Sequence, residues 1–410
     1  MARTNRRDVL ADGEIQVVHC INRCVRRAFL CGKDPLTGKD YEQRRELIRE
    51  RMEFLAGVMG IEVLGFAVMS NHFHCILRSR HDVVETWSDD EVARKWWMLC
   101  PARKNKDGSP AEPTEFELNA IRGKTGQAPD DVQAPGDFDS TVGSQSRFST
   151  GLKDKRVRLS SISWFMRFLS ERVAKEANKQ DECTGRFWEG RFKAQVLLDE
   201  AAILACMQYV DLNPIRAGIA TKPETSDFTS VKERIADLKA AGDVATPKEA
   251  PSTGLTATFS PDAGEKGQVE DNRIEHGERA GWLAPIALSG DAPSSGLSAT
   301  FSPEAGEKGE LGRRRASSKG CLPMGLGDYL QLLDWTGRQI RTDKRGAMPQ
   351  NLEPLFERLG ISTELWVDCV VNFRKWFRSS VGRPKSMEAA AESRSQNRAI
   401  SISSARKAFK

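Results

Sequence analysis

Several features that would place a chain in a membrane or outside the cell are missing from this 410-residue sequence. No apolar run approaches the roughly 18 residues that a membrane-spanning helix needs, and the mean hydropathy is −0.49. The first residues, Met-Ala-Arg-Thr-Asn-Arg-Arg-Asp, are basic, but no apolar segment follows them as it does in a secretory signal. We therefore expect a cytoplasmic protein with no membrane partner.

Cysteine pairs with metal-site or redox spacing are also missing. The chain has nine cysteines, an odd number, and none belongs to a Cys-x-x-Cys pair. This usage suits reduced, structural thiols in a reducing compartment. A zinc site built from His19, Cys20, Cys24 and Cys31 is not expected, because their spacing matches no standard ribbon or finger.

Histidine and tyrosine are scarce, with five and three residues. Two of the histidines fall in the most apolar stretch, Phe66 to Arg78, where β-branched and aromatic residues predict two strands with Ser70-Asn71 at the turn. Alternate side chains of a strand share a face, so His72 and His74 are predicted to point the same way. Two interpretations are open: a divalent metal site, or hydrogen-bonded groups at a sheet edge.

Positive charge is concentrated in the C-terminal part. The whole chain has a net charge of +5, whereas residues 313 to 410 contain 19 basic and 9 acidic side chains, a balance of +10. Such asymmetry is typical of a nucleic-acid contact, although a basic tail also serves solubility. Near the end of the last helical pattern the basic residues are Arg374, Lys375, Arg378, Arg383 and Lys385.

The residue patterns predict, in chain order, a strand, a helix, two strands, a helix, a strand and a helix. The expected bounds are 15–22, 41–59, 61–69, 73–77, 161–178, a strand ending at 198, and 200–212. Asp40 and Asp199 stand where they would cap the first and the last of these helices. Pro214 stops the last helix, because a residue before proline is disfavoured in the helical region.

Composition divides the chain into three expected parts. These are an N-terminal domain, a low-complexity linker and a basic α-helical C-terminal domain, at 1–222, 223–315 and 316–410. An inserted, mostly surface segment with one short helix is expected at about 86–157. Within the linker, a 17-residue unit at 251–267 recurs at 293–309, and two such polar copies are too few for a repeat fold.

A metal ion held by two imidazoles beside a tyrosine is a tool for cleaving a phosphodiester. The ion would polarise the phosphorus while the phenol, with a pKa near 10, attacks and forms a 5′-phosphotyrosine. Tyr41 begins an outer helix and Tyr329 belongs to the C-terminal part, which leaves Tyr209 as the candidate nucleophile. The alternative is that Tyr209, like most tyrosines, is a packing residue.

Three motifs resemble those of one enzyme family. Met69-Ser70-Asn71-His72-Phe73-His74 is similar to the Met-Pro-Asn-His-x-His signature of single-tyrosine HUH transposases of the insertion-sequence-200-like type, especially the REP-associated tyrosine transposases. The runs at 185–192 (GRFWEGRF) and 209–218 (YVDLNPIRAG) resemble the other two landmarks of that family. The resemblance covers roughly residues 15 to 220 without the inserted segment. Ser70 replaces the usual proline, which we expect only to loosen the turn.

The resemblance implies a ferredoxin-like α+β fold, the HUH endonuclease core, in which helices pack on an antiparallel sheet. It implies His72 and His74 as metal ligands, Asn213 as the polar residue that completes the metal site, and Tyr209 as nucleophile. The metal would be Mg²⁺ or Mn²⁺, ions that accept nitrogen and oxygen ligands together. The enzyme, a monomer or a homodimer, would nick and rejoin single-stranded or hairpin DNA.

Basic and aromatic residues alternate around the second motif, a pattern that suggests a DNA contact. Charged side chains would hold phosphates and the rings would stack on unpaired bases; alternatively, the rings are core and the arginines a solvated face. The candidate phosphate contacts are Arg186, Arg191, Lys193 and, where it would steady charge on the scissile phosphate, Arg216. The rings are Phe187, Trp188 and Phe192.

Two functions compete with the metal-dependent DNA enzyme. One is a domesticated DNA-binding regulator that keeps the fold without turnover; against it, all three expected catalytic positions are filled. The other is a metal-binding RNA-binding protein, since ferredoxin-like sheets often bind RNA through aromatic side chains on a strand. Here imidazoles occupy the strand instead, which favours the enzyme.

Overall fold

The computed structural model describes residues 10, 13–25, 30–34, 38–123, 151–240, 280–288, 314–340, 356–357, 359, 361, 363–377, 379–393 and 402–409. Both copies of the duplicated unit and Arg378 lie outside the described residues. Among the helices of the described part, none has the length and apolar character needed to cross a bilayer.

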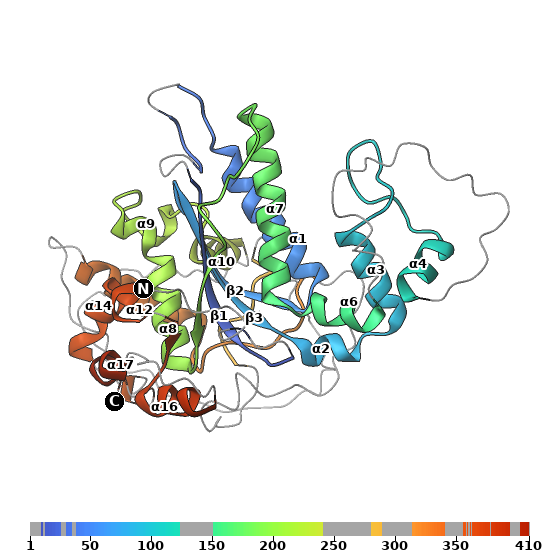
Figure 1. Cartoon of the computed structure of the whole chain (residues 1–410). Coiled ribbons are helices and arrows are strands. Elements are labelled where there is room, and N and C mark those ends of the chain that lie inside the picture. The colour runs from blue at the N-terminus through green and yellow to red at the C-terminus, as the bar shows by residue number, and fades with distance from the viewer. Residues whose placement is uncertain are drawn as a thin grey trace, which may run out of the picture.

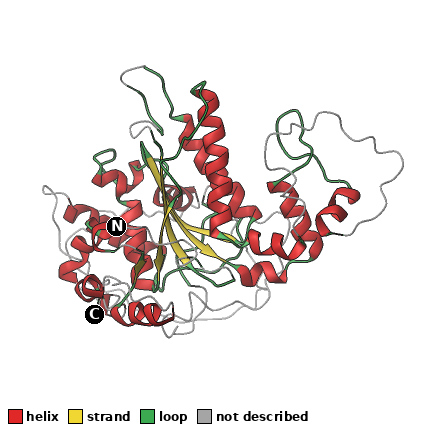
Figure 2. Ribbon diagram, in the orientation of Figure 1, coloured by secondary structure: helices red, strands yellow, loops and turns green. Residues whose placement is uncertain are grey.

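Four antiparallel strands form the centre of the molecule (Figures 1 and 2). They are β1 (Val17–Arg23), β2 (Ile61–Val68), β3 (His72–Ser79) and β4 (Lys193–Leu197). Their order across the sheet is β2-β3-β1-β4, with one helix between β1 and β2 and another before β4. This is the ferredoxin-like βαββαβ arrangement, so the expected fold class is confirmed. A two-residue strand that was not expected, β5 (Ser380–Val381), pairs with β4 in parallel.

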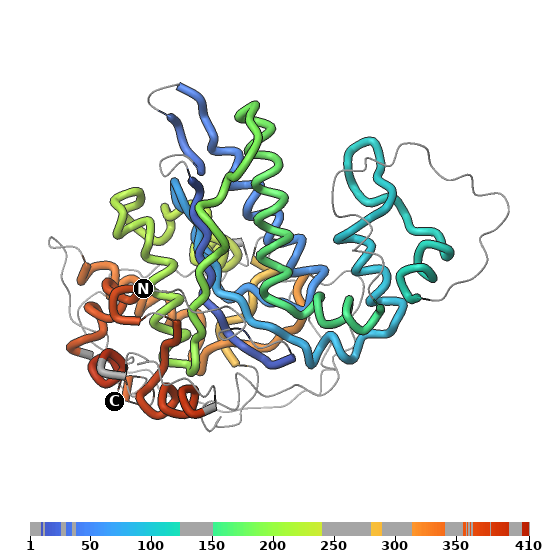
Figure 3. The backbone as a smooth tube through the Cα atoms, in the orientation of Figure 1, coloured from blue at the N-terminus to red at the C-terminus, as the bar shows by residue number. Residues whose placement is uncertain are grey.

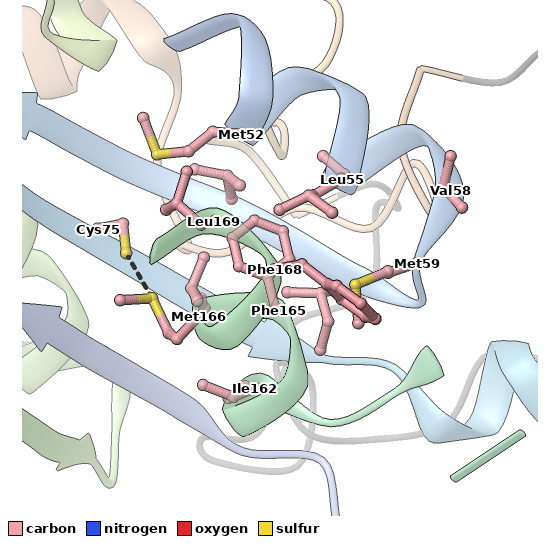
Figure 4. Close-up of a cluster of buried hydrophobic side chains, with 14 of the residues drawn as sticks. Met52, Leu55, Val58, Met59, Cys75, Ile162, Phe165, Met166, Phe168 and Leu169 are labelled. Carbon is pink, nitrogen blue, oxygen red and sulfur yellow. Dashed lines mark hydrogen bonds between the residues drawn. The ribbon is translucent and has the colours of Figure 1, made fainter. Parts of the chain in front are cut away.

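Two long helices cover one face of the sheet, α1 (Gln43–Val58) and α7 (Ile162–Gln180). Each carries an apolar stripe at helical spacing, and the two stripes meet over the strands (Figure 4). Phe165 and Leu169 of α7 are fully buried, as is Met52 of α1. The Cys75 thiol of β3 lies 3.5 Å from the Met166 sulfur. The side chains between these two helices and the sheet therefore form an apolar core.

The opposite face is covered by α8 (Glu200–Asp211), whose residues are all buried. The Asp199 carboxylate accepts a hydrogen bond from the Ala202 amide at 2.9 Å, which confirms the predicted cap. After Leu212 the chain continues as α9 (Asn213–Arg216), with Pro214 in its first turn, where a proline is tolerated. The predicted end of the last helix is thus confirmed to within one residue.

The C-terminal part packs around α8 and does not lie apart from the sheet (Figure 3). Apolar residues of α8 share one buried cluster with side chains of the C-terminal elements. Those elements are α12 (Leu326–Ile340), α14 (Thr363–Val371), α15 (Phe373–Trp376), α16 (Pro384–Ser393) and α17 (Ile402–Ala408). The α-helical character expected of this part is confirmed, and its boundary at 315/316 stays a prediction.

The inserted segment differs from its expectation of one short helix. Its described residues form α3 (Asp89–Leu99), α4 (Glu115–Arg122) and α6 (Leu152–Leu159), next to α2 (His81–Thr86). Trp96 and Trp97 are buried, and the Trp97 indole donates to the Ala111 carbonyl at 2.7 Å. Both tryptophans share one buried apolar cluster with side chains of α4 and α6, a packing that composition alone did not reveal.

Two stretches of the expected linker are ordered against the sheet. One is α10 (Ser230–Ala240), and the other is residues 280–288, where the Ala284 amide donates to the Val63 carbonyl at 2.9 Å. Lys319 and Gly320, just beyond the linker, also contact the sheet. Their carbonyls accept hydrogen bonds from the buried Arg78 guanidinium, which pairs with Glu62 at 2.5 Å. These two stretches therefore pack against the sheet, and the bounds of the linker stay a prediction.

Candidate metal and tyrosine site

The two histidines of β3 lie side by side on the face of the sheet that α8 covers. Their ring centroids are 4.9 Å apart, as expected for alternate residues of one strand. His74 is fully buried and His72 is half-buried. The prediction that both point the same way is confirmed.

A third histidine, His19 of β1, lies beside them. His19 Nε2 is 2.9 Å from His74 Nδ1, and His19 Nδ1 is 3.3 Å from Gln195 Oε1 of β4. In the strand register His19 faces Ile76, and Ile21 faces His74, so the two histidines are diagonal neighbours on one face. Sequence reasoning considered His19 only with the nearby cysteines and missed this contact. The alternation of β1, which places His19 and Ile21 on one face, was the available signal.

Burial keeps all three imidazoles neutral. Desolvation lowers the pKa of His19 to about 3 and that of His72 to about 4, and neighbouring arginines add to the effect. The pKa of His74 falls well below its usual value, again mainly because the ring is buried. A neutral imidazole has one nitrogen lone pair, which is the form that binds a metal ion.

The donor set fits a divalent ion that also takes oxygen ligands. The Asn71 carboxamide oxygen lies 2.5 Å from His72 Nδ1, which leaves the Nε2 of His72 available. His74 Nε2 is buried without a hydrogen-bond partner, and so is the Asn213 Nδ2. Within the described residues no group of three or more histidine, cysteine or carboxylate side chains could hold a metal ion. A metal here would therefore need amide or water oxygens beside the two imidazoles.

Tyr209 occupies the last turn of α8, directly above the histidines. Its ring meets His74 edge to face, with centroids 5.6 Å apart, and meets His19 in the same way at 5.9 Å. Asn213 lies in the next turn of chain, where its Oδ1 accepts from the Arg216 guanidinium at 3.4 Å. The structure thus places the candidate nucleophile against one candidate ligand, and places Asn213 against Arg216.

The tyrosine is covered by two side chains. Phe373 of α15 stacks on its ring, with a centroid separation of 5.5 Å and an interplanar angle of 24°. The Arg216 guanidinium lies 4.9 Å from the centre of the same ring and donates to the Val371 carbonyl at 2.7 Å. Tyr209 is left only 7% exposed. Sequence reasoning missed Phe373 because it is far from Tyr209 along the chain.

The end of α8 is held by a buried carboxylate that sequence reasoning also missed. Asp211 accepts hydrogen bonds from the Ser230 hydroxyl at 2.6 Å, the Val231 amide at 3.2 Å and the Tyr329 phenol at 2.6 Å. Burial raises the pKa of the Asp211 carboxyl, against the opposing effect of Arg234 and these donors. The network fixes the turn of helix that carries Tyr209 to α10 and α12.

The candidate DNA contacts divide into two groups. Arg186, Arg191 and Lys193 are exposed. The positive charge of Lys193 contributes to the lowered pKa of His72. The aromatic rings between them, Phe187, Trp188 and Phe192, are buried in the core. In this conformation they cannot stack on unpaired bases. The solvated charges beside the strand remain as candidates.

Comparison with known proteins gives one structural likeness. No family model matches the chain, and no curated protein matches it. A solved structure of a REP-associated tyrosine transposase bound to a REP hairpin is similar over 64% of this chain and 100% of the other. The TM-score is 0.31 and the sequence identity 11%.

Proposed function

We propose that this chain is a metal-dependent enzyme that nicks and rejoins single-stranded or hairpin DNA through a 5′-phosphotyrosine, as a transposase does. The observation that carries the proposal is the packing of Tyr209 against His74, with His72 beside it on the same sheet face. Two of the three sequence motifs support it, since they supply these same residues. The positive charge at Lys193 and Arg216 suits a phosphodiester substrate.

Tyr209 is the proposed nucleophile. Its phenol oxygen attacks the phosphorus, a new O–P bond forms, and the bond from phosphorus to the 3′-oxygen breaks. The phenol loses a proton and the departing 3′-oxygen gains one, so charge is balanced. One phosphate ester replaces another, which makes the step reversible and allows rejoining. Arg216, already against the phenol ring, is positioned to neutralise charge on the phosphate.

His72, His74 and Asn213 are the residues proposed to hold Mg²⁺ or Mn²⁺. Such an ion, when bound, polarises the phosphodiester. The imidazoles contribute neutral nitrogens because burial lowers the pKa of both. Asn213, which is 8% exposed, lies four residues after Tyr209 in the chain.

A second function is favoured by the covering of Tyr209. Phe373 stacks on the ring, and Tyr209 is only 7% exposed in this conformation. A domesticated regulator that binds DNA without cutting it would need no access to this group. The two functions differ in whether a covalent protein–DNA bond ever forms.

The test is a cleavage assay on end-labelled single-stranded hairpin DNA with Mg²⁺ or Mn²⁺. The enzyme proposal expects a covalent protein–DNA band with wild type that disappears with chelator and with Tyr209→Phe. Tyr41→Phe removes a phenol that lies just before α1 and is the matched control, so it should keep the band. Tight hairpin binding with no band across a broad set of hairpins would favour the regulator.

A further inference from the structure

We infer that His19 is a positioning residue that holds His74 in the tautomer needed for metal binding. Gln195 orients His19, and His19 Nε2 accepts a hydrogen bond from the Nδ1–H of His74. The Nε2 of His74 then carries a lone pair that can bind a metal ion. The inference deepens the proposed function and rests on it for the identity of the ligand. It concerns three strands, because Gln195, His19 and His74 belong to β4, β1 and β3.

The first step is the hydrogen bond between Gln195 and His19. The carboxamide oxygen of Gln195 faces His19 Nδ1 at 3.3 Å. A carbonyl oxygen only accepts, so Nδ1 of His19 must carry the proton. Gln195 and His19 are direct partners in the register of β1 and β4, and both are buried. The strand pairing itself therefore fixes this contact.

The second step follows from the single proton of a neutral imidazole. With Nδ1 protonated, His19 Nε2 has only a lone pair, and it lies 2.9 Å from His74 Nδ1. His74 must donate across this contact, since two lone pairs would repel. His19 is fully buried, and an unpaired charge is costly to bury, so the ring keeps a single proton. The relay ends at His74 Nε2, which is buried and has no hydrogen-bond partner.

The ring geometry supports a hydrogen bond and not a face-to-face stack. The two ring planes differ by 14°, and their centroids are 5.1 Å apart. The difference between this separation and the 2.9 Å nitrogen–nitrogen distance is close to two ring radii. The rings therefore lie edge to edge in nearly one plane, with the nitrogens pointing at each other as a linear hydrogen bond requires.

His72 reaches the same tautomer by a different route. Its Nδ1 lies 2.5 Å from the carboxamide oxygen of Asn71, the preceding residue. His72 can thus be oriented within the β2–β3 turn alone, whereas His74 depends on two further strands. Partners of this kind orient metal ligands, and losing one typically lowers metal affinity by about 10–100-fold. Both ligands are therefore oriented only when β1 and β4 have paired with β3 in the sheet.

The first test reads the tautomer directly, without metal. The full chain labelled with ¹⁵N-histidine contains only five histidines, and His72→Gln and His74→Gln spectra assign the two ligands. Two-bond ¹H–¹⁵N correlations at neutral pH should show His74 protonated at Nδ1. His19→Phe, which keeps a planar ring and removes the acceptor, should abolish this preference. An Nε2-protonated His74 in wild type, or an unchanged His74 in His19→Phe, would overturn the inference.

The second test measures Mn²⁺ binding by calorimetry. His19→Phe and Gln195→Leu should bind about 10–100-fold more weakly than wild type. His19→Gln, which offers an amide oxygen in place of Nε2, should restore the affinity to within a few-fold. His81→Gln removes a histidine outside the relay and should change nothing. Unchanged affinity in a folded His19→Phe would overturn the positioning role.

The two tests separate this inference from the proposed function. A wild-type protein with the Nδ1 tautomer, altered by His19→Phe, supports the relay whatever the enzyme does. If that protein then bound no Mn²⁺, the metal-dependent function would fail, whereas the control of the His74 tautomer by His19 would stand. If it bound Mn²⁺ through the relay but formed no covalent DNA bond, only the proposed catalysis would fail.

Discussion

At the scale of single residues, the site is a set of polar groups held where water has been removed. Burying a titratable group disfavours its charged form, which is why the pKa of each imidazole is lowered and that of Asp211 is raised. The neutral imidazoles become usable ligands. Asp211 instead becomes an anchor whose protonation state is tied to the fold.

The free energy of unfolding should depend on pH through Asp211. Because its pKa is raised by folding, the native state keeps the proton at pH values where the unfolded chain, with an ordinary pKa of about 3.9, has lost it. The stabilisation is therefore complete below about pH 4 and declines as pH rises through the folded pKa. Urea unfolding at a series of pH values should show this decline in wild type relative to Asp211→Asn. Parallel pH profiles for the two proteins would contradict it.

DNA affinity should depend on the exposed basic side chain of Lys193, near His72. Lys193→Glu places a negative charge next to His72, so it should weaken hairpin DNA binding and reduce the salt dependence of that binding. Arg191→Glu should act in the same direction. The matched control is Lys106→Glu, an equal charge change in the exposed loop of the inserted segment. Fluorescence anisotropy at several salt concentrations measures the effect, and equal losses in all three variants would argue against a local DNA contact.

At the scale of elements, α8 carries the candidate nucleophile and is fixed at both ends. Asp199 caps its start and also accepts a 2.5 Å hydrogen bond from the Arg383 amide of the C-terminal part. Asp211 holds its end to α10 and α12. A helix held in this way keeps Tyr209 over the histidines with little freedom to turn.

Removing the cap should destabilise the protein measurably. Asp199→Ala leaves the Ala202 amide without its acceptor, a loss of about 0.5–2 kcal/mol for a helix N-cap. The Arg383 amide loses its partner at the same time, so the upper part of this range is expected. Asp199→Asn keeps one acceptor oxygen and should lose less. The midpoint of urea unfolding gives the comparison, and an Asp199→Ala protein as stable as wild type would show that water replaces the cap.

At the scale of the whole molecule, both faces of the sheet are covered, and by different parts of the chain. Figure 1 shows α1 and α7 on one side and the C-terminal helices with α8 on the other, while the inserted helices extend beyond α2. Phe373 and Tyr329 come from the C-terminal part, yet they contact Tyr209 and Asp211 of α8. The C-terminal part is thus continuous with the core that supports the site.

Deleting residues 316–410 should therefore unfold the sheet and not simply release a domain. The deletion uncovers the apolar cluster around α8, and exposing such a surface to water removes the main driving force for folding. We expect a single cooperative transition in calorimetry of the full chain, and an aggregated or partly unfolded 1–315 product. Two separate transitions, or a soluble and folded 1–315 protein, would support the domain boundary at 315/316.

Local patterns predicted a large part of the candidate site. The two-residue alternation of a strand placed His72 and His74 on one face, and Asp199 and Pro214 set the ends of the segment that carries Tyr209. The order of elements through β4 was predicted in the same way. These signals act between residues a few positions apart, so the sequence displays them directly.

What the sequence by itself determined is thus the order of the elements from β1 to α8 outside the inserted segment, and the side of each that faces inward. Only the tertiary structure decided that His19 meets His74, that Phe373 covers Tyr209, and that the inserted segment folds as several helices. The two contacts, His19 with His74 and Phe373 with Tyr209, each join residues far apart in the chain. They depend on strand register and on which apolar surfaces are left to bury once the sheet has formed, and local sequence patterns carry no record of either.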